Sequence, residues 1–200
     1  MAAVPLWQYG TGEIDSAASR VTHFMKLPHF TGTAWQGSPK LPDATCGWAM
    51  LTAEGGHPGN DAQHAVIRRW TAPRDGTAFI TGRLIHSQPK GDGVRARVVS
   101  NRHGIIGNWT AFNRGVSTPT EKLAFKAGDT LDLVVDCLGS VDSDSFQWSP
   151  VVWMVAPSEP GEWHSKVAFA GPTAPPPPPL TVWEKYAQVL LETNEFAFVD

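Results

Sequence analysis

The sequence predicts an all-β fold, an antiparallel β-sandwich of jelly-roll type, followed by a proline-rich spacer and one C-terminal helix. Short segments of alternating polar and apolar residues recur about every 8–12 residues, separated by turns of Gly, Asp and Pro. Gly and Pro together make up 36 of the 200 residues (19 plus 17), against roughly 12% in an average protein. Both observations are typical of a sandwich. We therefore assign residues 1–170 to a β-sandwich domain, 171–180 to a linker and 181–200 to a helix.

The clearest strands lie between residues 63 and 155. In VRARVVSN (94–101) the small apolar residues alternate with Arg95 and Arg97, so the apolar set is expected to face the core and the arginines to face outward. The turn signals PRDG and KGDGV bound the neighbouring strands. Further strands are expected in QHAVIRRWT (63–71), TAFITGRLIHS (77–87), NRHGIIGNWTAFNRG (101–115), EKLAFKAGDTLDLVVDC (121–137) and, as the terminal strand, WSPVVWMVAP (148–157).

The first 60 residues are less regular than the rest of the domain. Residues 7–10 and 23–30 are expected to supply edge strands, and TAEGGHPGNDAQ (52–63) is expected to be a long loop. Most tryptophans are expected to fill the core, a set that comprises Trp48, Trp70, Trp148 and Trp153.

The C-terminal segment changes character at five consecutive prolines. A proline run adopts an extended polyproline II conformation of about 3.1 Å per residue, so 171–180 reads as a stiff spacer. Thr181 and Glu184 then form a capping box that starts a helix of about 14 residues. Its mostly apolar stripe, which needs a surface to dock on, consists of Trp183, Ala187, Leu190, Leu191 and Asn194.

Charge and motifs exclude several classes of protein. The net charge of −3 argues against a nucleic-acid binder, and no run of 18 apolar residues predicts a membrane span. The N-terminus lacks the basic and apolar regions of a signal peptide. No GxSxG, HExxH or Walker motif is present, so no catalytic residue is predicted. Cys46 and Cys137 are either two buried thiols or one disulfide, and the sequence leaves both readings open.

The closing segment WEKYAQVLLETNEFAFVD (183–200) resembles the C-terminal end of the planctomycete-type surface cytochrome family. The upstream stretches GGHPG, RRW, GDGV and AGDTLDLVVD resemble the carbohydrate-binding-like β-domain inserted in such proteins, and also the non-catalytic jelly rolls of polysaccharide-degrading enzymes. The resemblance implies a larger exported protein at the periplasm or cell surface, in which the helix belongs to a neighbouring domain of unknown function. Because CxxCH is absent here, haem would be bound only by other parts of that parent protein.

The candidate ligand-binding residues are those that suit a sugar. An exposed Trp covers the CH-rich face of a sugar ring, while Arg, Asn and His bond its hydroxyl groups. Arg68, Arg95 and Arg97 are expected to line one sheet face, where they would match uronate or sulfate groups. The alternative is that acidic residues such as Asp132 and Asp136 pair with them across the strands. The predicted set is Trp109, Asn108, Arg68, Arg95, Arg97 and His57.

The loop VDSDS (141–145) contains the only candidate metal ligands, Asp142 and Asp144, which suit Ca²⁺ through hard oxygen atoms. A solvated loop is the alternative reading. The predicted function is non-catalytic polysaccharide binding, with polysaccharide and neighbouring domains as partners. The alternatives are a module that packs between domains without a ligand and, lower in rank, a polysaccharide hydrolase or lyase.

Overall fold

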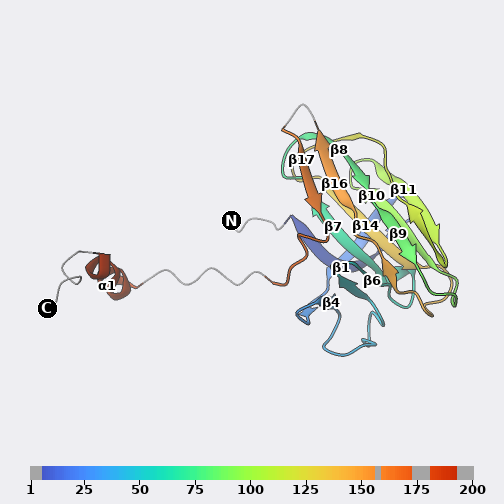
Figure 1. Cartoon of the computed structure of the whole chain (residues 1–200), viewed down its shortest axis with the longest axis horizontal. Coiled ribbons are helices and arrows are strands. Elements are labelled where there is room, and N and C mark those ends of the chain that lie inside the picture. The colour runs from blue at the N-terminus through green and yellow to red at the C-terminus, as the bar shows by residue number, and fades with distance from the viewer. Residues whose placement is uncertain (1–5, 156–158, 173–180, 193–200) are drawn as a thin grey trace.

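The computed structural model describes residues 6–155, 159–172 and 181–192. Within these ranges the strands form three antiparallel sheets, and one helix follows at the C-terminal end (Figure 1). The predicted all-β sandwich with a C-terminal helix is therefore confirmed. The proline run of the predicted spacer lies outside the described residues.

The first layer is a six-stranded sheet in the order β11-β10-β14-β7-β1-β2. Its inner face carries the predicted apolar set, since Val94, Ala96 and Val98 are all fully buried. The register pairs Ala96 with Val135 of β14, which places a second apolar row beside the first. The strands are β1 (Trp7–Asp15), β2 (Arg20–Lys26), β7 (Ala65–Thr71), β10 (Val94–Ser100), β11 (Gly104–Ala111) and β14 (Thr130–Cys137).

The second layer consists of two sheets that nearly continue each other. One has the order β12-β9-β15-β6-β5-β4-β3 and the other β13-β8-β16-β17. The strands of the longer sheet are β3 (His29–Phe30), β4 (Ala34–Gln36), β5 (Met50–Thr52), β6 (Gly55–His57), β9 (Arg83–His86), β12 (Arg114–Ser117) and β15 (Phe146–Gln147). Those of the shorter sheet are β8 (Gly76–Thr81), β13 (Leu123–Phe125), β16 (Val151–Val155) and β17 (Gly161–His164).

Gly82 marks the bend between these two sheets. Its carbonyl oxygen accepts from the Thr118 backbone N–H at 3.0 Å, so the chains stay bonded across the break. A Cβ at Gly82 would lie 3.1 Å from the Thr118 hydroxyl and 3.2 Å from Pro150, so only glycine fits without a shift.

The core lies between the two layers as one continuous apolar cluster. Trp70 of β7 and Trp148, which follows β15, are almost fully buried in it, as predicted. The indole N–H of Trp148 donates to the Thr118 hydroxyl at 3.0 Å, which satisfies its polar atom inside the core. Burial of this apolar surface is the main term that holds the two layers together.

Three sequence-based predictions about elements are wrong. Strand β1 is not an edge strand, because it pairs with both β7 and β2. The expected loop at 52–63 contains strand β6 and the 3₁₀ turn η1 (Ala62–His64). Strand β16 is not terminal, since β17 pairs with it. For β1 and β6 the deciding partners are β7 and β15, which are distant in sequence and which a local pattern does not show. Strand β17, by contrast, is the next strand along the chain after β16.

The outer face of the first layer is covered in part by the hairpin β1–β2. Phe24 of β2 packs against an apolar cluster that includes Ile67, Val99 and Val134. Gly10 makes room for this ring, because a Cβ there would lie 2.7 Å from it.

The two cysteines are free thiols, and both are buried. The disulfide alternative is therefore excluded in this structure. Burial is the main cause that raises the pKa of each thiol to about 11, so both stay protonated at neutral pH.

Helix α1 (Val182–Glu192) begins with the predicted capping box. The Glu184 backbone N–H donates to the Thr181 hydroxyl at 3.2 Å, and the Thr181 N–H donates back to the Glu184 carboxylate at 2.7 Å. Trp183 and Leu191 are 80% and 75% exposed, so the sandwich does not cover this part of the apolar stripe. No described helix is long and apolar enough to cross a membrane.

Candidate functional site

Arg95 and Arg97 project from the outer face of the first layer, as predicted, and both are paired with the same carboxylate. Both guanidinium groups lie against Asp136 of the neighbouring strand, with N–O distances of 3.0 and 2.6 Å. The Asp136 side chain is fully buried between them. This is the cross-strand acidic pairing that the sequence left open, and it compensates one of the two positive charges.

Arg68 lies on the opposite face from Arg95 and Arg97, so the prediction that the three share a face is wrong. Its side chain points into the sandwich, where it is 2% exposed. The guanidinium donates to the carbonyl oxygen atoms of Thr52 and Gly55 at 2.5 and 2.8 Å. Arg68 thus ties the β5–β6 turn to β7, and it is not accessible to a ligand.

Trp109 and Asn108 do not form one contact surface. Successive residues of a strand point to opposite faces, and Trp109 is paired with the buried Ala96. The Trp109 ring is half-buried against the core cluster and fills the space above Gly107, while Asn108 is exposed on the outer face beside Arg97. The exposed tryptophan that a sugar-binding surface needs is therefore not Trp109.

Trp48 is exposed, although the sequence predicts it in the core. It is 44% exposed and lines a hollow of about 530 Å³, which we call the Trp48 hollow. The hollow also receives His57, the remaining predicted contact residue, and Asp142. Its full lining is Leu41, Trp48, Met50, His57, Val141, Asp142, Ser143 and Ser145.

Three segments far apart in the sequence build the Trp48 hollow. Trp48 lies just before β5, His57 ends β6, and the serines belong to the loop between β14 and β15. The pairing of β5 with β6 brings Met50 opposite His57, and the pairing of β6 with β15 brings the third segment alongside. No local sequence pattern predicts that these three segments come together. The only signal in the sequence is that Trp48, in CGWAM, lies outside any alternating segment.

The hollow offers an aromatic ring and hydrogen-bonding groups side by side. The rings of Trp48 and His57 lie 6.3 Å apart at an angle of 52°. The His57 Nδ1 lies 2.8 Å from the Pro58 carbonyl oxygen, which can only accept, so Nδ1 carries the proton and Nε2 is left as an acceptor. Burial lowers the pKa of His57 and keeps the ring neutral at pH 7. The Asp142 carboxylate is exposed at the rim.

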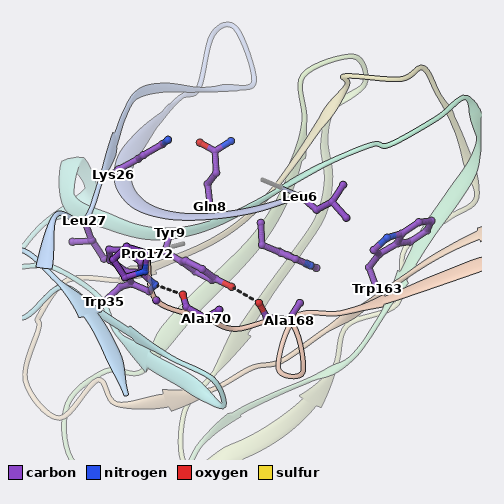
Figure 2. A pocket seen from close by; sticks show the side chains of 12 residues that line it. Leu6, Gln8, Tyr9, Lys26, Leu27, Trp35, Trp163, Ala168, Ala170 and Pro172 are labelled. Carbon is purple, nitrogen blue, oxygen red and sulfur yellow. Dashed lines mark hydrogen bonds between the residues drawn. The ribbon is translucent and has the colours of Figure 1, made fainter. Parts of the chain in front are cut away.

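A second hollow of about 450 Å³ lies beside β1 and β4 and has a different chemistry (Figure 2). The Tyr9 hydroxyl donates to the Ala168 carbonyl at 3.3 Å and the Trp35 indole N–H donates to that of Ala170 at 2.8 Å. The two rings lie 6.1 Å apart and nearly parallel. Since both polar groups are already bonded, this aromatic hollow presents mainly apolar surface.

The predicted metal candidates occupy different environments. Asp142 is exposed, while Asp144 is fully buried behind it. In the described residues no three His, Cys, Asp or Glu side chains converge as a metal-binding group.

No protein-family model matches the chain, and no curated protein matches it either.

Proposed function

We propose that this chain is a non-catalytic polysaccharide-binding module whose contact surface is the Trp48 hollow. The observation that carries the proposal is the exposed Trp48 ring in a hollow that is also lined by His57, Asp142 and two serines. An indole ring matches the CH-rich face of a sugar, and the surrounding groups match its hydroxyls. A β-sandwich supplies a rigid support for such a surface.

The charges around the hollow favour a neutral sugar over an acidic one. Asp142 lines the hollow and no described arginine or lysine does, whereas Arg95 and Arg97 lie elsewhere and are paired with Asp136. A carboxylate accepts hydrogen bonds from hydroxyl groups but repels a second anion. We therefore expect retention by neutral polysaccharides and little retention by polyuronates.

Affinity gel electrophoresis with a panel of neutral and acidic polysaccharides tests this function. Trp48→Ala is expected to lower the affinity about tenfold or more, because aromatic anchors at an interface carry on the order of 2 kcal/mol. The matched control is Phe112→Ala, which removes an aromatic side chain of similar exposure (43%) outside the hollow. The proposal fails if no polysaccharide retards the chain, or if Trp48→Ala migrates like the unmodified protein.

A second candidate is a module that packs against neighbouring domains of a larger protein. The exposed apolar side chains of α1 and the aromatic hollow of Figure 2 favour it, since such surfaces are usually covered by a partner. The resemblance of residues 183–200 to the surface cytochrome tail fits the same idea and adds export to the periplasm or cell surface. An open reading frame with an upstream CxxCH and a signal peptide would support this setting.

A further inference from the structure

Asp144 is the most unusual carboxylate in the described part of the chain. Its side chain is 0% exposed, and neither carboxylate oxygen has a hydrogen-bond partner. Buried carboxylates are normally paired with a cation or bonded to N–H groups, because an isolated buried charge is costly. We therefore expect a partner from outside the protein chain to bind the Asp144 carboxylate.

His86 does not neutralise Asp144, although its Nε2 lies 3.8 Å from the carboxylate. Nε2 lies 3.0 Å from the Ser143 carbonyl oxygen and must donate to it. Nδ1 accepts from the Asn113 backbone N–H at 3.3 Å. One ring nitrogen is thus a donor and the other an acceptor, which describes a neutral imidazole.

The other charges near Asp144 are negative. Asp92 in the β9–β10 loop and Asp142 in the β14–β15 loop act together with burial, the larger cause, to raise the pKa of Asp144 to about 7. Asp136 contributes less and is already paired with two arginines. The two loops therefore bring several carboxylates together without a matching cation.

Two of the oxygen atoms in these loops lie close together beside Gly91. The Asp142 carbonyl oxygen lies against the position that a Cβ of Gly91 would occupy, and Asp144 Oδ1 lies 3.5 Å from the same point. Gly91 has a φ of +81°, a conformation that L-residues with side chains rarely adopt. The absence of a side chain at Gly91 thus lets the Asp142 carbonyl oxygen approach closely, next to the Asp144 carboxylate, and we call this pair of oxygen-bearing groups beside Gly91 the cradle.

We propose that this cradle binds a calcium ion, with the Asp144 carboxylate as its anchor and the Asp142 carbonyl as a further ligand. Because no three side chains converge here, the remaining ligands must be main-chain oxygen and water. Calcium accepts six to eight such oxygen ligands, whereas zinc requires a tetrahedral set of side-chain N, S or O atoms. The Asp142–Ser145 loop also lines the Trp48 hollow, but the calcium site does not depend on sugar binding.

The test uses the full chain after treatment with EDTA, titrated with CaCl₂ by calorimetry and by thermal unfolding. We expect one calcium per chain and a rise in Tm on the order of 5 °C when calcium exceeds its Kd about 100-fold. NaCl at equal ionic strength should give no such rise. Asp144→Asn is expected to lose the calcium response, and Asp92→Asn, which alters an exposed residue, is expected to weaken binding at least several-fold.

Glu121→Gln is the matched control, since it removes an exposed carboxylate outside the cradle and should keep the full response. The proposal is overturned if calcium at about 10 mM, above the weakest Kd range of protein sites, produces neither heat nor a Tm shift. It is also overturned if the folded Asp144→Asn variant binds calcium as the unmodified chain does. If that variant does not fold, unchanged binding by Asp92→Asn has the same consequence.

Discussion

Replacing Arg68 by Met tests whether a buried charge can anchor a turn through carbonyl oxygens alone. The guanidinium makes two short hydrogen bonds, to Thr52 and Gly55, and a longer one of 3.4 Å to Ala53. Burial lowers the pKa of Arg68 to about 10, so the group remains charged at pH 7. Met fills a similar volume but leaves these acceptors without their donor.

Each short bond from a charged group contributes about 1.5–3 kcal/mol, and the burial of the charge offsets part of the sum. We therefore expect Arg68→Met to lower the free energy of unfolding by about 3 kcal/mol, and Tm by about 6–12 °C for a chain of this size. Urea unfolding followed by tryptophan fluorescence measures the first quantity and calorimetry the second.

Arg20→Met is the control, because Arg20 is exposed on β2 and its loss should change stability by no more than about 0.5 kcal/mol. A loss below about 1 kcal/mol in Arg68→Met, or a gain, would refute the reasoning. It would mean that the desolvation of the guanidinium cancels the bonds it forms.

Two further predictions follow from buried polar groups. Asp136→Asn leaves two guanidinium groups without a counter-charge and should cost about 2–4 kcal/mol in urea unfolding, whereas a neutral result would mean that solvent already screens the pair. Burial raises the pKa of Tyr9 to about 12, so the native state keeps a proton that the unfolded chain loses above about pH 10. Stability should therefore fall as pH rises from about 10 to 12, and Tyr9→Phe should flatten that part of the pH profile; an equal slope in both proteins would contradict this.

The sequence was informative where a residue's environment depends on its own strand. The alternation at 94–98 predicted which residues are buried, and the Thr181–Glu184 pair predicted the start of α1. In the same way, Asn108 and Trp109 are successive residues of one strand and point to opposite faces of the sheet. A single binding surface that contains both side chains is therefore incompatible with strand geometry.

The candidate site was harder to predict because it depends on contacts between distant segments. Trp48 lies outside any alternating run, so its exposure is decided by which loops pack beside it. An arginine is usually a surface residue, so the sequence predicts Arg68 on a sheet face, yet three carbonyl groups of the β5–β6 region accept its hydrogen bonds inside the sandwich. For Asp144 the sequence offered the residue type, and only the fold shows that nothing in the chain satisfies it.

The reactivity of the two buried, protonated thiols can be used to measure local unfolding of the sandwich. A thiolate is the species that reacts with alkylating reagents and with disulfides, and neither Cys46 nor Cys137 presents one while the layers stay closed. Each cysteine is therefore expected to be labelled only when the region of the sandwich around it is locally unfolded. Cys46 precedes β5 of the second layer and Cys137 ends β14 of the first layer. Equal labelling rates would mean that the two layers unfold together, and unequal rates would mean that one region unfolds before the other.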